Sequence, residues 1–321
     1  MEKIIEPISR QLILDELTED KFLRHSNKLQ NQMYLVNAHN SPSILKEIGR
    51  LREEAFRLAG GGTGKSMDID VYDTATKPFE QLIVWDPEDE EIIAGYRLKK
   101  CSEAELDANG NLETPTTHLF KISPNFYNNY LPLTLELGRS FVQPRYQRGG
   151  DSKKGLFSMD NLWDGLGAVV LQNTDIKYLF GKVTMYPQYP RAARNLILSF
   201  LNFYFPDTKE LVRPIAPLTT EQELRLYQVS FEGLSFKEGY QILNKEVRAL
   251  GTNIPPLINT YMNISGTMKT FGTALNLSFG EVEETGILVN TEDIFPSRKE
   301  RHLDTYYENK QYIGPKVKWK G

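Results

Sequence analysis

The chain has 321 residues, with 38 lysines and arginines against 42 aspartates and glutamates and a formal net charge of −4. This balance excludes a general binder of nucleic acid or other polyanions. Hydrophobic residues make up 40% and charged residues 25%, which excludes disorder as a description of the whole chain. The one cysteine, Cys101, and four widely separated histidines predict neither an internal disulfide nor a metal site, and they fit a reducing cytoplasm.

The N-terminal residues are mixed in charge and lack an apolar run before a small-residue cleavage site, so we expect no secretory signal. The longest apolar and aromatic stretch, residues 196–205, is far shorter than the roughly 20 residues that a membrane-spanning helix needs. We therefore expect a cytoplasmic protein, with peripheral contact at the inner membrane left open.

Hydrophobic spacing, caps and turn residues predict the elements in chain order. They are a helix over 44–59, a hairpin of strands 80–85 and 91–98, a strand over 133–142, a helix over 162–172, a strand over 177–185, a helix over 191–205, a helix that opens with the capping box Ser235 and Glu238 and ends near 251, and β-rich runs over 267–277 and 286–291. Strand, helix, strand, helix implies at least one parallel βαβ unit, and hence an α/β fold.

Carboxylates cluster after the first predicted helix, at Asp68, Asp70 and Asp73. One interpretation is a turn rich in aspartate caps, or a weak cation site. The other is a buried network, because Arg52 on the helix and Arg97 on the hairpin are available as partners.

Glu136 and Arg139 form the sharpest candidate pair, because the glutamate stands in the middle of a predicted interior strand. A buried carboxylate must be paired or be reached by substrate. It is therefore either part of a structural ion pair or a general base that accepts a proton from an attacking amine, with Arg139 positioning an anionic group or another carboxylate. Gly138 between them permits a bulge, and its amide could donate to an oxyanion.

These motifs together resemble a known family, the GNAT-related N-acyltransferases that include acyl-homoserine lactone synthases. The matching pieces are Arg52 and Phe56, Asp68-x-Asp70-x-x-Asp73, Gly95-Tyr-Arg97-Leu98 and Leu-Glu136-Leu-Gly-Arg139-Ser-Phe. The runs DNLWDGLGAVVL, YLFGKVTMYPQYPRAARNLI and IPPLINTYMNISGTMKTFG are closer to the hemolysin-like proteins. Those are similar to ornithine N-acyltransferases of ornithine-lipid synthesis and glycine N-acyltransferases of Bacteroidetes glycine-lipid synthesis.

The resemblance, over roughly residues 41–291, implies a GNAT-like α/β fold, with a mixed, twisted central sheet flanked by helices and splayed near Glu136. We expect a lead segment over 1–40, the N-acyltransferase domain over 41–295 with a helical insertion at about 219–251, and a charged tail over 296–321.

The resemblance also implies an activity, the transfer of a fatty or 3-hydroxy acyl chain from an acyl carrier protein to the α-amino group of an amino acid, most plausibly glycine. Glu136 would be the base and Arg139 its strand partner, while Arg52, Asp70, Asp73 and Arg97 would line the cleft. No tightly bound cofactor and no metal are implied. Ornithine or lysine as acceptor, acyl-CoA as donor, and a non-catalytic lipid- or carrier-binding module remain alternatives.

The loop after the Glu136 strand matches the pyrophosphate-binding loop of GNAT enzymes only in part, as Gln147-x-x-Gly150-x-Ser152. The phosphopantetheine arm of a carrier protein does not need that loop. An acidic carrier would dock on basic residues. Candidates beside the loop are Arg145, Arg148, Lys153 and Lys154, with Gly150 in the loop itself contacting the pantetheine arm. The alternative is a solvated loop.

Overall fold

The computed structural model describes residues 1–147, 153–218 and 221–308. Within them the central feature is an eight-stranded sheet in the order β1-β2-β3-β4-β6-β7-β10-β9. Its strands are β1 (Phe22–His25), β2 (Gln32–Val36), β3 (Glu80–Asp86), β4 (Glu91–Lys100), β6 (Thr134–Val142), β7 (Tyr178–Met185), β10 (Val282–Asn290) and β9 (Lys269–Asn276). Neighbouring strands are antiparallel except β6 and β7, which are parallel. The mixed sheet predicted from the sequence is confirmed.

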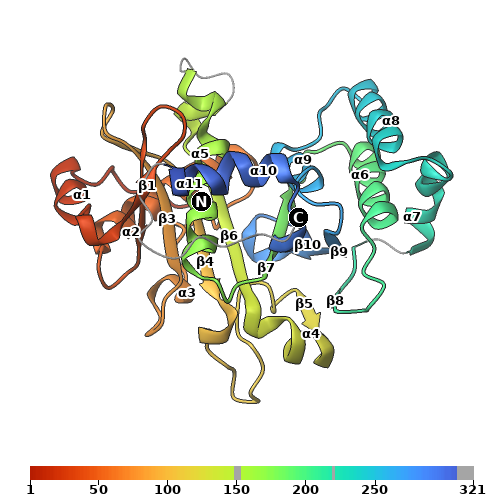
Figure 1. Ribbon diagram of the computed structural model, residues 1–321, viewed down its shortest axis with the longest axis horizontal. Helices are drawn as coiled ribbons and strands as arrows, with labels where there is room; N and C mark the ends of the chain where they lie inside the picture. The colour runs from red at the N-terminus through yellow and green to blue at the C-terminus, as the bar shows by residue number, and fades with distance from the viewer. Residues whose placement is uncertain (148–152, 219–220, 309–321) are drawn as a thin grey trace.

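Helices cover both faces and both ends of the sheet (Figure 1). The longer ones are α2 (Pro42–Leu58), α5 (Ser158–Gln172), α6 (Arg191–Tyr204) and α8 (Phe236–Ala249); the shorter ones are α1 (Arg10–Glu16), α3 (Val71–Thr74), α4 (Pro124–Asn129), α7 (Glu221–Gln228), α9 (Pro256–Met262), α10 (Pro296–Lys299) and α11 (Thr305–Glu308). A small two-stranded sheet pairs β5 (Phe120–Ile122) with β8 (Val212–Pro214). None of the helices in the described ranges combines the length and apolarity needed to cross a membrane.

Alternation along the strands divides the core into two layers. On β3, Leu82 and Val84 belong to the cluster that contains α5 and α6, while Ile83 and Trp85 belong to the cluster that contains α2. This is the period of two that a strand covered on both faces requires. Gly165 lets α5 pack closely on β3, because a Cβ at this position would lie only 2.9 Å from Leu82 Cδ1.

The predicted elements from α2 to β10 are confirmed. β3 and β4 form the hairpin, and α5 connects the parallel strands β6 and β7 as the βαβ unit. α8 opens with Ser235 and Glu238 in a complete capping box. α5 starts at Ser158, earlier than the predicted residue 162.

Both ends of the chain contribute more to the folded structure than the sequence indicates. The expected lead segment 1–40 supplies β1 and β2 to the main sheet, where Met33 and Val36 are buried. The expected solvated tail begins with residues 296–308, which pack on α5 and bury His302 and Tyr306. Apolar and paired polar groups at these ends remove surface from water, which offsets the entropy cost of ordering them.

Candidate active site

The sheet opens between its two parallel strands. β6 pairs with β7 only from Thr134 to Leu137, whose partners run from Tyr178 to Gly181. Beyond this point β6 continues beside β4 alone, and β7 continues beside β10. A cavity of about 680 Å³ lies at the opening and is lined by residues of β6, β7, α5 and α9. The splay near Glu136 expected from the sequence is therefore present.

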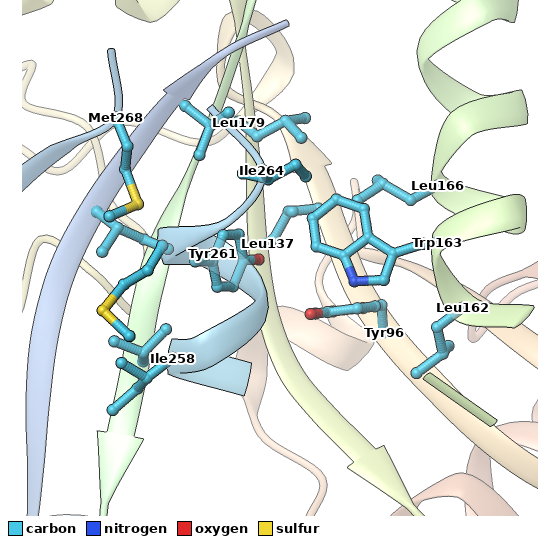
Figure 2. Close-up of a cluster of buried hydrophobic side chains, with 14 of the residues drawn as sticks. Tyr96, Leu137, Leu162, Trp163, Leu166, Leu179, Ile258, Tyr261, Ile264 and Met268 are labelled. Atoms are coloured by element: carbon cyan, nitrogen blue, oxygen red, sulfur yellow. The ribbon is translucent and has the colours of Figure 1, made fainter. Parts of the chain in front are cut away.

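The cavity has a polar and an apolar side because alternate strand residues face opposite sides of the sheet. Glu136 and Lys182 line it from one face. Leu137 lines it from the other, with Tyr261 of α9 beside it. Figure 2 shows Tyr261 of α9 beside Leu137. The ring of Trp163 of α5 meets the Tyr261 ring edge-on, with the ring centroids 5.6 Å apart. An amphipathic substrate matches these two linings.

Glu136 is buried, with 2% of its surface exposed, and it lines the cavity. Its Oε1 accepts hydrogen bonds from the Thr116 backbone N–H at 3.2 Å and the Thr116 hydroxyl at 2.6 Å. Its Oε2 is buried and has no hydrogen-bond partner among the described residues. One oxygen thus orients the carboxylate and the other is left to accept a proton or an N–H from a substrate.

The three aspartates form one network with Arg52 and Arg97, as the second interpretation of the sequence predicts, and Arg139 joins it as a third arginine. Asp73 is buried between Arg52, at 3.2 Å, and Arg97, at 3.2 Å. Arg97 also donates to both carboxylate oxygens of Asp70 at 2.7 Å. Burial raises the pKa of Asp73, but the two guanidinium groups outweigh it and hold that pKa well below its usual range. The same carboxylates raise the pKa of Arg97 against the effect of its burial.

Arg139 belongs to this network and not to Glu136. Its Nε lies 2.8 Å from Asp68 Oδ2, and its guanidinium lies 4.0 Å from the centroid of the Phe279 ring. No ion pair joins Arg139 to Glu136 among the described residues, so the structural pairing weighed in the sequence analysis is absent. The physical reason is a bulge: β4 residues Gly95 and Arg97 pair with Phe141 and Gly138, so that Arg139 is turned out of the regular alternation.

The left-handed backbone at this bulge lies at Arg139, with φ +49°, rather than at Gly138. A non-glycine residue there costs on the order of 1 kcal/mol, which the ion pair and the aromatic contact of Arg139 offset. A Cβ built on Gly138 would meet nothing closer than Arg97 Nε at 4.0 Å. The glycine therefore leaves open space in the cavity, two residues along the strand from Glu136.

Comparison with known proteins gives one decisive result. The chain is 51% identical over 306 residues to a glycine N(alpha)-acyltransferase of Phocaeicola vulgatus, which covers 95% of this chain and 94% of the relative. It is 52% identical over 312 residues to a glycine N(alpha)-acyltransferase of Bacteroides thetaiotaomicron, covering 96% and 92%. The chain belongs to the family of these acyltransferases. Residues 51–154 also match the acetyltransferase (GNAT) domain family.

Among solved structures, the chain is similar to FeeM, an N-acyl amino acid synthase from uncultured soil microbes, with a TM-score of 0.38, 9% identity, and coverage of 88% of this chain and 100% of that one. The acyltransferase assignment rests on the sequence relatives and the GNAT match.

In this acyltransferase, only some of the residues proposed for carrier docking lie in the part of the chain that the structure describes. Arg145 is exposed over 61% of its side chain and pairs with Glu91 at 2.8 Å. Lys154 lies 2.7 Å from Asp86 and also contacts Glu88 and Asp89 at 3.0 Å each, so acidic groups compensate its charge. Lys153 begins a short 3-10 helix. The predicted positions Arg148 and Gly150 lie outside the described residues.

Three residues of the site are not singled out by sequence reasoning. Thr116, which holds Glu136, lies in an irregular segment whose sequence gives no signal of the contact. Lys182 and Glu284 line the cavity and form an ion pair at 3.2 Å. Lys182 carries the signal that revealed Glu136, a charged residue inside an apolar strand, in Tyr-Leu-Phe-Gly-Lys182-Val. Glu284 stands in an acidic run and carries no such signal.

Cys101 is not part of the site chemistry. It is buried in the cluster that contains Phe120 and Phe180. Burial, together with the nearby negative charge of Glu136, raises the pKa of its thiol well above the ordinary value. The thiolate is the nucleophilic form, so this environment disfavours a covalent role.

Proposed function

We propose that this acyltransferase moves a fatty acyl chain, 3-hydroxylated or not, from the thioester of an acyl carrier protein to the α-amino group of glycine, as a step in aminolipid synthesis. The observation that carries the proposal is Glu136, whose free Oε2 lies at the opening of the sheet. The family supports the acyl transfer, and the names of the two relatives support glycine as acceptor.

The reaction needs a deprotonated amine beside a thioester. As the nitrogen attacks the thioester carbonyl carbon, the C–N bond forms and Glu136 accepts a proton from the nitrogen. Collapse of the tetrahedral intermediate breaks the C–S bond, and the proton passes to the departing thiolate. Holding amine and thioester together at the opening contributes much of the rate by proximity.

Charge balance at the site favours a cationic acceptor. The three arginines of the network (Arg52, Arg97 and Arg139) offset its three aspartates (Asp68, Asp70 and Asp73). No lysine or arginine among the described residues forms an ion pair with Glu136. Its carboxylate is therefore buried without a cationic partner there and attracts the ammonium group of an amino acid, which releases one proton to solvent before the neutral amine attacks.

An extended thioester arm fits the edge of β6 that the sheet leaves open. Beyond Leu137 that edge lacks the pairing with β7. Amide groups of a pantetheine arm can hydrogen-bond to such an edge as an added strand does. The acyl chain then lies on the apolar side, near Leu137 and Tyr261.

A carrier protein is favoured over acyl-CoA as donor because α5 begins only at Ser158, well after β6 ends at Val142. A helix N-terminus placed directly after the strand would hold a pyrophosphate. The exposed Arg145 is available to an acidic carrier. Supplying acyl carrier protein and acyl-CoA in parallel assays distinguishes the two donors.

The test is mass spectrometry of the product from the purified chain, glycine and each donor. We expect N-acyl glycine from the wild-type protein, and a turnover lower by a factor of about 100 or more for Glu136→Gln, which keeps an oxygen for Thr116 but accepts no proton. Glu113→Gln, an exposed residue of the same segment as Thr116, is the matched control. A Glu136→Gln variant as fast as its control, or no product with either donor, would overturn the proposal.

A further inference from the structure

The polar side of the cavity holds a second charged pair, on β7 and β10. Lys182 Nζ lies 3.2 Å from Glu284 Oε2, and the same oxygen accepts a hydrogen bond from Asn276 at 3.0 Å. Both side chains are largely buried, with 10% of Lys182 and 6% of Glu284 exposed. Burying this pair costs desolvation energy. Because the pair lines the cavity, a role in binding substrate can account for its presence there.

Lys182 and Glu136 are connected through a single peptide group. Lys182 Nζ donates to the Pro115 carbonyl oxygen at 2.9 Å, and Glu136 Oε1 accepts from the Thr116 N–H at 3.2 Å. That carbonyl and that N–H belong to the same planar unit. The ammonium and the carboxylate therefore lie on its two edges, within about 8 Å of each other. This segment fixes the relative position of the two charged groups.

The separation matches one α-amino acid. The nitrogen of glycine and its carboxylate oxygens lie about 3 Å apart, and a hydrogen bond at each end adds about 3 Å. A molecule whose amine contacts Glu136 Oε2 can thus reach Lys182 with its carboxylate.

Lys182 also has an N–H donor to spare. An ammonium has three N–H donors, and the described contacts of Lys182 use two, to Pro115 and to Glu284. Among the described residues, the other cations that line the cavity are Arg97, which holds Asp70 and Asp73, and Arg139, which holds Asp68. Lys182 differs from them in its hydrogen bond to the segment that orients Glu136.

We propose that Lys182 binds the carboxylate of the acceptor amino acid while Glu136 receives the proton from its amine. The proposal rests on the proposed function and names the group that selects the acceptor. Lys182 and Glu136 clamp the two ends of the smallest amino acid, and Glu284 with Asn276 holds the ammonium in place.

The test compares glycine with glycinamide, which has the amine but no carboxylate. The variant is Lys182→Met combined with Glu284→Gln, because this pair of changes leaves no buried charge unpaired and keeps an oxygen for Asn276. Lys177→Met, whose side chain is 49% exposed and pairs with Glu292, is the matched control. The readout is the ratio of kcat/KM for glycine to that for glycinamide, in which differences in intrinsic amine reactivity cancel between variants.

We expect the wild type and the control to prefer glycine, and the double variant to lose about 10- to 100-fold of that preference through a higher KM for glycine. Equal losses on both substrates, or a wild type that does not distinguish them, would overturn the role of Lys182 while leaving glycine acylation in place. A wild type that acylates neither substrate would instead remove the proposed function, and this inference with it.

Discussion

Asp73 shows how one buried carboxylate organises the site. It faces Arg52 and Arg97, and it accepts hydrogen bonds from Gln81 at 3.0 Å and from the Asp70 backbone N–H at 3.1 Å. We expect Asp73→Asn to lower the free energy of unfolding by about 3 kcal/mol at pH 7, because it leaves two buried guanidinium groups short of a partner. Urea unfolding measures this change.

The pH dependence of that loss follows from the depressed pKa. Since the folded pKa of Asp73 lies below its unfolded value of about 3.8, the stabilising contribution is fully present above that value and is lost as the pH falls through the folded pKa. The gap between wild type and variant should therefore shrink below about pH 4. Asp175→Asn, at an exposed pair with Lys100, should change stability by less than about 1 kcal/mol. A gap that is the same at every pH would refute the assignment.

The sequence predicts which charges matter but not which pairs form. Arg52 and Arg97 stand on predicted elements and the aspartates cluster between them in the sequence, so their meeting could be expected. The partners of Glu136 and Arg139 could not, because both depend on tertiary structure. Thr116 reaches Glu136 from a distant irregular segment, and the bulge redirects Arg139 toward Asp68. A one-residue irregularity in a strand leaves no periodic signal.

Gly181 governs the opening between β6 and β7. It is the partner of Leu137, at the last paired position, and a Cβ on it would meet the Leu137 carbonyl oxygen at 2.5 Å. We expect Gly181→Ala to push the two strands apart, lower the unfolding free energy by about 2 kcal/mol and reduce turnover. Thermal unfolding and the N-acylation assay measure the two effects.

Gly138→Ala is the comparison for that prediction. Its Cβ has open space, so stability should change by less than about 1 kcal/mol while the new methyl group enters the cavity. If Gly181→Ala proved as stable as Gly138→Ala, the close approach of Gly181 to the Leu137 carbonyl would not limit the size of the residue at position 181.

Elements with a strong local pattern were predictable and short elements at the chain ends were not. α2 begins with a proline in its first turn and α8 with a capping box, and both carry an apolar stripe. The β3–β4 hairpin has two apolar runs around an acidic turn. β1 has only four residues, and its stability comes from pairing with β2 and from contacts with residues almost 300 positions away. Such contacts have no signature in a local window.

At the level of the whole molecule, the two ends of the chain meet on α5. Asp164 of α5 accepts hydrogen bonds from the Asn27 backbone at 2.9 Å and side chain at 2.8 Å, and it lies 2.7 Å from His302 Nδ1. The buried Arg24 donates to the backbone carbonyl of His302 at 3.2 Å. Figure 1 shows α11 beside α5, which it contacts. The segment at the β1 edge of the sheet and the C-terminal helices thus both bind to α5, the helix that lines the cavity.

In this arrangement a single side chain, Asp164, stabilises contacts with both ends of the chain. Asp164→Ala removes the acceptor for two N–H groups of Asn27 and the partner of buried His302, so we expect the unfolding free energy to fall by about 3 kcal/mol. Asp160→Ala, one turn earlier on the same helix, breaks only the more exposed pair with Arg301 and should cost less than about 1 kcal/mol. Urea unfolding with an unchanged slope measures both. If the two variants unfolded at the same urea concentration, the ends of the chain would be dispensable for the stability of the sheet, and the contacts between Asn27, Asp164 and His302 would be a consequence of folding and not one of its causes.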